Sequence, residues 1–222
     1  MKIVVLCDFD GTTVNIDTAE YTLEKLAEGN WKTLDERLDS GEMPLEECMR
    51  QQFMMVKAPR KRIVDALDIV VQVRPGFEDL VEHCRSKDIP LTIASAGLDF
   101  YIRHFLSQRG LQGKVGLVVP RVSVTRNGLR FAFPELRDPS SVSFKDDLVR
   151  HYKKQGKTVV YVGDGTTDFN AARIADLPFA VIGSKLAVLL SKHGIPHNEF
   201  MDFRDIVEAL KNLERQAEMP GQ

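Results

Sequence analysis

Short apolar runs rich in β-branched residues recur along the chain and predict the buried strands of a sheet. These runs cover residues 3–6, 91–94, 115–119, 159–162 and 179–182. Between most of them lie segments in which apolar residues recur at helical spacing. Strands that alternate with helices in this way indicate an α/β fold with a doubly wound parallel sheet.

Two segments depart from this alternation. Residues 122–133 form two alternating stretches that flank Asn127-Gly128, a strong hairpin signal, so a hairpin is expected to project from the sheet. Residues 17–72 contain helical patterns and no good strand, which predicts a small helical cap inserted into a core of residues 1–16 and 73–222. Because the cap leaves the sheet directly after the first strand, its inner surface should face the carboxyl end of that strand.

The composition is that of an ordinary globular protein. Of 222 residues, 43% are hydrophobic and 28% are charged, and the formal net charge of -2 gives no large field for binding nucleic acid or a membrane. The three cysteines match no zinc or disulfide spacing, which favours reduced thiols and a cytoplasmic location. The oligomeric state is left open.

Four polar pieces follow one another along the chain, and three of them stand at the ends of predicted strands. They are Asp8-Phe-Asp-Gly-Thr12, Ser95-Ala96-Gly97, Lys145, and Gly163-Asp-Gly-Thr-Thr-Asp168. The carboxyl ends of parallel strands meet at one edge of an open sheet, where ligands bind. The pattern therefore predicts that these pieces meet in one crevice.

The crevice is expected to be crowded with carboxylates. Asp8 and Asp10 lie two apart on an extended segment, so both side chains leave the same side, and Asp164 and Asp168 add two more. Each like-charge pair at 4 Å would repel by about 4 kcal/mol at an effective dielectric of 20. A cation is therefore required, and an oxygen-only ligand set beside a phosphate favours Mg²⁺.

These residue types suit phosphoryl transfer through a covalent intermediate. Asp8 is the expected nucleophile, and Asp10 is expected to protonate the leaving oxygen and then to activate water. Lys145 and the metal ion would offset the repulsion between a carboxylate and a phosphate dianion. Thr12, Ser95 and backbone N–H groups near Gly11 and Gly97 are candidates for the remaining hydrogen bonds to phosphate.

The four pieces resemble motifs one to four of the haloacid dehalogenase (HAD) superfamily, whose core is a Rossmann-like sheet and whose helical cap follows motif one. The resemblance covers nearly the whole chain. It implies a nucleophilic Asp8, an acid/base Asp10, and phosphate binding by the Ser95-Ala96-Gly97 segment and Lys145. It also implies Mg²⁺ held by Asp8, the Asp10 carbonyl and Asp164, with Asp168 in support.

Within that superfamily, the chain looks most like the phosphoserine phosphatase group, and within that group most like the methionine-salvage branch of 2-hydroxy-3-keto-5-methylthiopentenyl-1-phosphate phosphatases. It departs from true phosphoserine phosphatases where substrate is recognised: Asp17 replaces a glutamate, Gln52 stands near their arginine with Arg50 two residues away, and Thr167 replaces an asparagine. The expected substrate is a small phosphorylated metabolite.

Three other functions use the same residues and stay open at this point. They are hydrolysis of phosphoserine, phosphoryl transfer to another alcohol, and binding of a phosphometabolite without catalysis.

Overall fold

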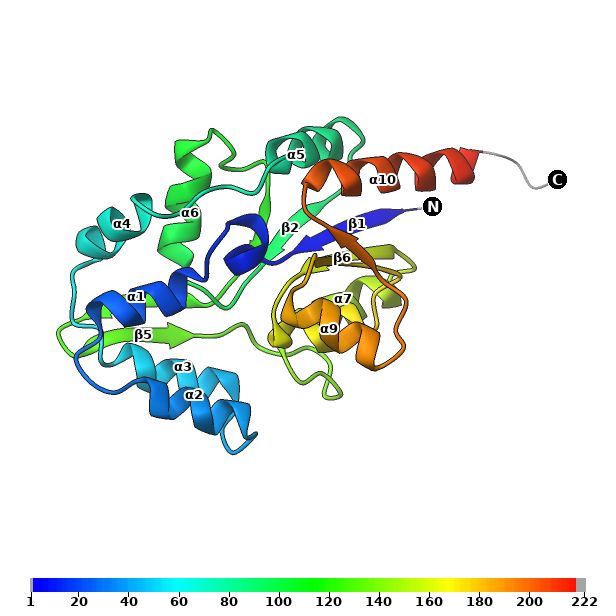
Figure 1. Cartoon of the computed structure of the whole chain (residues 1–222). Coiled ribbons are helices and arrows are strands. Elements are labelled where there is room, and N and C mark those ends of the chain that lie inside the picture. Colours follow the sequence, from blue (N-terminus) through cyan, green and yellow to red (C-terminus); the bar gives the residue numbers. More distant parts are fainter. Residues whose placement is uncertain (1, 219–222) are drawn as a thin grey trace.

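The computed structural model describes residues 2–218, which form an α/β fold built on a six-stranded parallel sheet with the order β3-β2-β1-β6-β7-β8 (Figure 1). The strands are β1 Ile3–Cys7, β2 Leu91–Ala94, β3 Gly116–Val118, β6 Thr158–Gly163, β7 Leu177–Val181 and β8 Asn198–Phe200. The predicted fold class is confirmed. Strand β8 was not predicted, since only Phe200 of its three residues is apolar and buried.

Helices cover both faces of the sheet and create two separate cores. On one face lie α5 (Phe77–Ser86), α6 (Asp99–Gln108) and α10 (Phe203–Glu218), and on the other lie α7 (Phe144–Lys154), α8 (Phe169–Ala172) and α9 (Lys185–Lys192). The alternation of β1 divides its side chains between them: Val5 and Cys7 pack in the first core, and Val4 and Leu6 pack in the second. Both faces of β1 are thus buried, which explains its uninterrupted apolar run.

The chain between β1 and β2 forms the helical insertion. Its helices are α1 Thr18–Leu26, α2 Lys32–Asp39, α3 Leu45–Phe53 and α4 Arg60–Asp68. The segments that enter and leave it run antiparallel: Val14 bridges Val73, and the backbone N–H of Arg74 donates to Thr13 O at 2.9 Å. Within residues 2–218, no helix is long and apolar enough to cross a membrane.

A hairpin of β4 (Arg121–Thr125) and β5 (Gly128–Ala132) stands apart from the main sheet, as predicted. Its turn differs by one residue from the sequence expectation. Thr125 pairs with Gly128, so the connecting loop is Arg126-Asn127, and Gly128 is already the first residue of β5. The hairpin packs against α3 of the insertion, where the rings of Phe53 and Phe131 are 4.9 Å apart.

Gly128 lies close to the backbone of Met54, at the end of α3 in the insertion. Its φ is +105°, and a Cβ there would lie 2.4 Å from Met54 O. We expect Gly128→Ala to lower the free energy of unfolding by about 3 kcal/mol, because it combines backbone strain with a clash against main-chain atoms. Urea denaturation measures this.

Gly110→Ala is the matched control. Gly110 also has a positive φ, +64°, but an added Cβ would meet no atom within 4 Å. Its cost should be limited to backbone strain, about 1 kcal/mol. Equal destabilisation by the two substitutions would contradict the proposed contact with Met54.

Candidate active site

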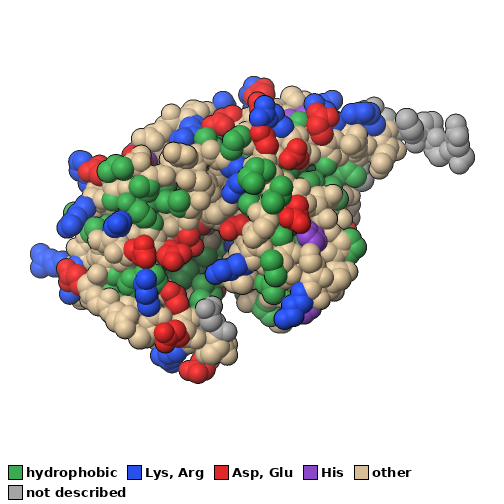
Figure 2. Space-filling model, in the orientation of Figure 1, with side chains coloured by type: hydrophobic (Ala, Val, Ile, Leu, Met, Phe, Trp, Pro, Cys, Tyr) green, Lys and Arg blue, Asp and Glu red, His purple; other side chains and the backbone are tan. Residues whose placement is uncertain are grey.

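A cleft of about 540 Å³ lies at the carboxyl ends of the central strands, between the sheet and the insertion. Figure 2 shows it as a hollow with acidic side chains gathered along one wall. The sheet order explains its position. Strands β2 and β3 are added on one side of β1 and strands β6 to β8 on the other, and ligands bind at such a switch point of a parallel sheet. Asp8 follows β1, Ser95 follows β2 and Asp164 follows β6, and all three line the cleft. The predicted pieces therefore meet in one site.

Asp8 and Lys145 form the buried centre of the site. Lys145 Nζ lies 3.0 Å from Asp8 Oδ1 and 2.7 Å from Asp168 Oδ1. The ammonium donates to Asp168, and Asp8 Oδ1 is left as a buried oxygen that accepts no well-aligned hydrogen bond. Burial and the charge of Asp168 raise the pKa of Asp8 well above its usual value. Burial alone would lower the pKa of Lys145, but Asp168 and Asp8 together raise it, so Lys145 is a cation.

Asp168 is the anchor of this arrangement. It is fully buried, and both of its oxygens accept hydrogen bonds: Oδ1 from Lys145 and from Tyr161 Oη at 2.6 Å, and Oδ2 from the backbone N–H groups of Asp164 at 3.1 Å and Gly165 at 3.0 Å. Burial opposes ionisation, but Lys145 and the other donors lower the pKa of Asp168. Asp168 therefore positions Lys145 and the loop that carries Asp164.

Asp10 is held by three donors, two from Thr18 of the insertion and one from Ser95, which follows β2. Its Oδ1 accepts from Thr18 N at 2.8 Å and Thr18 Oγ1 at 2.5 Å, and its Oδ2 accepts from Ser95 Oγ at 3.2 Å. Burial, with a contribution from Asp17, raises the pKa of Asp10 to about 7 despite these bonds. Gly97 closes over the carboxylate, since a Cβ there would lie 2.3 Å from Asp10 Oδ2. Asp10 is thus oriented before any ligand arrives.

Asp164 faces the tight turn that follows β1. Thr12 Oγ1 donates to Asp164 Oδ1 at 2.7 Å, and a Cβ on Gly11 would lie 2.2 Å from Asp164 Oδ2. Burial and Asp168 raise the pKa of Asp164 to about 6. The hydroxyl of Thr12, a residue expected from the sequence to bind phosphate, is buried and holds Asp164, and Thr12 does not line the cleft. Arg74 supports the turn from outside by donating to Gly11 O at 2.7 Å and Thr12 O at 2.8 Å.

Asp8, Asp164 and Asp168 form a cluster that fits a metal ion. One carboxylate oxygen from each lies within 4.8 Å of the others. Burial and neighbouring carboxylates raise the pKa of Asp8 and of Asp164, and a bound cation would favour the ionised form of both. Because donors already occupy both oxygens of Asp168, the direct ligands available are Asp8 and Asp164.

The residues chosen as specificity candidates separate into two groups. Asp17, Gln52 and Thr167 line the cleft. Asp17 also caps α1, accepting from Glu20 N at 2.8 Å. Arg50 lies outside the cleft, where it pairs with Glu46 at 3.5 Å and covers the ring of Phe133.

Several site residues were missed from the sequence. Thr18 and Tyr161 orient the carboxylates of Asp10 and Asp168, and Arg74 holds the turn that follows β1. Asp35 and Lys185 line the cleft. None belongs to a motif with a chemical signature. Lys185 carries one signal that the sequence could have offered. It is a cation in the first turn of a helix, where it opposes the helix dipole, and such an unfavourable placement indicates a functional role.

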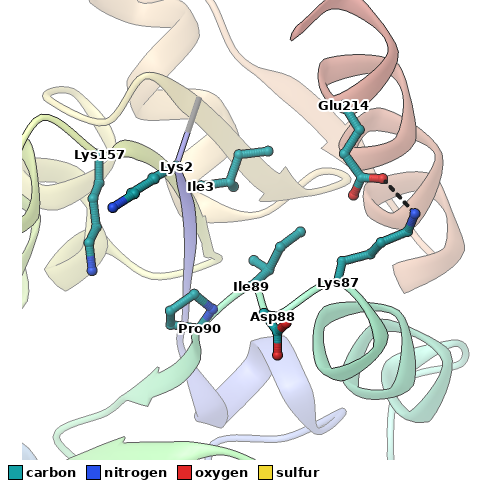
Figure 3. Close-up of a pocket in the computed structure, with 8 residues that line it drawn as sticks. All are labelled: Lys2, Ile3, Lys87, Asp88, Ile89, Pro90, Lys157 and Glu214. Atoms are coloured by element: carbon teal, nitrogen blue, oxygen red, sulfur yellow. Dashed lines mark ion pairs between the residues drawn. The ribbon is translucent and has the colours of Figure 1, made fainter. Parts of the chain in front are cut away.

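A second cavity, of about 400 Å³, lies at the opposite edge of the sheet, where Ile3 begins β1 and Pro90 precedes β2 (Figure 3). Three lysines line it, but one of them, Lys87, is already turned toward Glu214, with a separation of 3.7 Å between Lys87 Nζ and Glu214 Oε2. It contains none of the four motif pieces. The chemistry therefore belongs to the cleft at the carboxyl edge.

The comparisons with known proteins agree with this geometry. Residues 5–173 match the family model described as haloacid dehalogenase-like hydrolase. A 2-hydroxy-3-keto-5-methylthiopentenyl-1-phosphate phosphatase of Brevibacillus brevis is 27% identical, covering 97% of this chain and 98% of the relative. A polyol phosphate phosphatase of Saccharomyces cerevisiae is 26% identical, covering 96% and 94%.

Solved structures support the fold independently. A substrate-bound phosphoserine phosphatase superposes with a TM-score of 0.68 at 20% identity, covering 94% of this chain and 98% of that one. At this identity the likeness concerns the fold, which is a parallel sheet with an inserted helical segment.

Proposed function

The chain belongs to the haloacid dehalogenase-like hydrolase family, and on this basis we propose that it is a magnesium-dependent phosphomonoesterase that uses Asp8 as its covalent nucleophile. The observation that carries the proposal is the state of Asp8 Oδ1. This oxygen is buried at the end of the central strand, accepts no well-aligned hydrogen bond, and lies 3.0 Å from a cationic Lys145. A nucleophile needs such an available lone pair beside a positive charge that offsets repulsion from phosphate.

The residues present fit Mg²⁺. Asp8 and Asp164 would hold it together with the Asp10 carbonyl, and an all-oxygen set with few protein ligands suits an ion that keeps several waters. Bound magnesium would supply positive charge at the phosphate oxygens and lower the repulsion felt by the attacking carboxylate. Thr12 and Arg74 keep Asp164 and the turn after β1 in place for this purpose.

The protein's own groups divide the remaining work. Asp8 attacks phosphorus and forms an aspartyl-phosphate, while Lys145 neutralises a phosphate oxygen. Asp10, aimed by Thr18 and Ser95, donates a proton to the leaving alcohol oxygen and later removes one from the water that cleaves the aspartyl-phosphate. Ser95, Ala96 and Gly97 line the cleft beside this point. The N–H of Ala96 contributes to the phosphate site, while the N–H of Gly97 orients Ser95 by donating to its Oγ at 3.0 Å. Residues 17–72 act as a cap that limits access of other water.

Turnover of p-nitrophenyl phosphate with Mg²⁺ tests the class of function. A phosphatase releases p-nitrophenol and phosphate, whereas a protein that only binds phosphometabolites releases neither. Added alcohols separate hydrolysis from transfer, because a phosphotransferase would form a new phosphomonoester. Absence of turnover in the folded, magnesium-loaded protein would refute the proposal.

For the substrate we propose a phosphomonoester with an uncharged organic part, such as an enol-phosphate of the methionine-salvage type. The relatives named for such substrates are 25–28% identical over nearly the full chain. Phosphoserine should be a poor substrate, because its carboxylate would require a cationic partner on the cap. Gln52 is neutral, and Arg50 lies outside the cleft.

We expect kcat/KM for phosphoserine to be ten- to a hundredfold below that of a matched uncharged phosphomonoester. Each missing charge-assisted hydrogen bond costs about 1.5–3 kcal/mol. Parallel kinetic measurements on the two substrates decide the matter, with p-nitrophenyl phosphate as the reference for intact chemistry. A tenfold preference for phosphoserine would show that the cap recognises a carboxylate after all.

A further inference from the structure

The cap-side wall of the cleft presents hydrogen-bond acceptors above an apolar floor. Its acidic side chains are Asp17, Glu20 and Asp35. Its apolar part comes from residues of α1 to α3 and the loop before α2, namely Leu23, Trp31, Leu38, Leu45, Met49 and Phe53. No arginine lines the cleft within residues 2–218.

Gln52 joins this wall as an acceptor rather than a donor. It is 4% exposed, and its amide nitrogen is already used: Nε2 donates to Asp35 Oδ1 at 2.6 Å and to Trp31 O at 3.4 Å. The choice of amide orientation follows from these partners, since a carboxylate and a carbonyl can only accept. Among residues 2–218, no hydrogen bond to Gln52 Oε1 is present, and this oxygen is not fully enclosed. It is therefore available to a donor in the cleft.

Asp35 is held in place by the same contact. It lies on α2, is half-buried and lines the cleft, and the short bond from Gln52 on α3 fixes one of its oxygens. Gln52 thus positions a negative charge toward the space that the organic part of a substrate must occupy. A substrate carboxylate in this space would be repelled by Asp35. It would also receive no hydrogen bond from Gln52, whose amide nitrogen already donates to Asp35 and Trp31.

The two lysines that line the cleft lie away from the Gln52–Asp35 contact. Lys145 belongs to the phosphate end, beside Asp8. Lys185 is exposed on α9, on the core side of the cleft. Burial and Asp17 raise the pKa of Glu20, and Lys185 opposes the rise.

We propose that Asp35, positioned by Gln52, is a specificity-determining residue that selects substrates whose leaving group carries hydrogen-bond donors and no carboxylate. The inference rests on the proposed phosphatase function. Hydroxyl groups and ammonium groups can both donate the required hydrogen bonds. The carbon chain of the leaving group packs on Trp31 and Met49, while its donors reach Asp35 and Gln52 Oε1.

Three phosphomonoesters of equal chain length test the proposal in the wild-type protein with Mg²⁺. They are glycerol 3-phosphate, with two hydroxyl donors; propyl phosphate, with none; and 3-phosphoglycerate, with a terminal carboxylate. We expect kcat/KM for glycerol 3-phosphate to exceed that for 3-phosphoglycerate at least tenfold, with propyl phosphate also below glycerol 3-phosphate. Phosphoethanolamine shows whether ammonium donors serve as well as hydroxyls. Preference for either donor over both 3-phosphoglycerate and propyl phosphate supports the inference, and equal or better cleavage of propyl phosphate contradicts it.

Asp35→Asn tests the residue itself. It preserves size and removes the charge, so the ratio between glycerol 3-phosphate and 3-phosphoglycerate should fall at least fivefold, mainly through KM. Glu36→Gln is the matched control: Glu36 is the next residue on α2, is exposed and does not line the cleft, and its replacement should leave the ratio unchanged.

Two further results would overturn the inference. One is equal or better cleavage of 3-phosphoglycerate by the wild-type protein, which needs no variant to fold. The other is an unchanged ratio in a folded Asp35→Asn protein. Failure of the phosphatase proposal looks different, because then no phosphomonoester, p-nitrophenyl phosphate included, would release phosphate.

Discussion

Asp8→Asn is expected to abolish turnover, reducing kcat by more than about a hundredfold, and to leave the fold intact. Loss of an essential nucleophile costs at least this much because the covalent step cannot proceed. Stability should change by less than about 1 kcal/mol, since an amide removes a buried carboxylate that burial and like charges already disfavour. Lys145 keeps its bond of 2.7 Å to Asp168 in the variant. Phosphate release and urea denaturation provide the two measurements.

Asp168→Asn provides the contrast. It should also remove activity, but through loss of position: the buried cation of Lys145 loses its principal partner, and Tyr161 and two backbone N–H groups lose a charged acceptor. Breaking a buried pair of this kind typically costs about 3–5 kcal/mol of stability. Residual activity of Asp8→Asn above about a hundredth of wild type would exclude Asp8 as the nucleophile. Equal stability losses in the two variants would contradict the separate roles.

Removal of metal should have an effect of similar size. A chelator is expected to eliminate turnover and added Mg²⁺ to restore it, because Asp8, Asp164 and an incoming phosphate would otherwise repel one another. Ca²⁺ should fail to restore activity and should inhibit in competition, since its longer bonds and higher coordination number disturb a compact octahedral site. The measurement is phosphate release across a titration of each ion.

A second readout identifies the ligands without relying on activity. Mg²⁺ should raise the thermal unfolding midpoint of the wild-type protein, because binding to the folded state stabilises it. Asp164→Asn should lose this shift, whereas Asp176→Asn should retain it. Asp176 is an acidic residue before β7 that pairs with Lys153 on the protein surface, away from the cleft. Support of full turnover by Ca²⁺, or an unchanged shift in Asp164→Asn, would argue against the proposed magnesium site.

Much of the architecture follows from local patterns in the sequence. The apolar run of β1 predicts a strand buried on both faces, and its last residues place Asp8 at the carboxyl end of the sheet. The same reasoning delivers Ser95 and Asp164 to the same edge, because parallel strands expose their carboxyl ends together. The spacing of Asp8 and Asp10 further predicts that Phe9 points into the core, and its ring indeed packs at 5.2 Å from Phe105.

Local sequence patterns did not predict one short strand or the exact position of one hairpin turn. Strand β8 has three residues and one buried side chain, too few for an alternation to be seen. The hairpin was expected from Asn127-Gly128, but its turn is shifted by one residue, because Gly128 must lie against the backbone of Met54. That requirement comes from a helix far away in the sequence.

Sequence by itself placed Asp8, Ser95 and Asp164 at the cleft, because strand ends and motif spacing are local properties of the chain. Only the tertiary structure decided what each of them does. Thr12 turned out to hold Asp164, Asp168 to anchor Lys145 together with Tyr161, and Gln52 to present an oxygen while its nitrogen binds Asp35. Hydrogen bonds are directional and join side chains as far as 152 residues apart, so no pattern along the chain specifies which donor meets which acceptor.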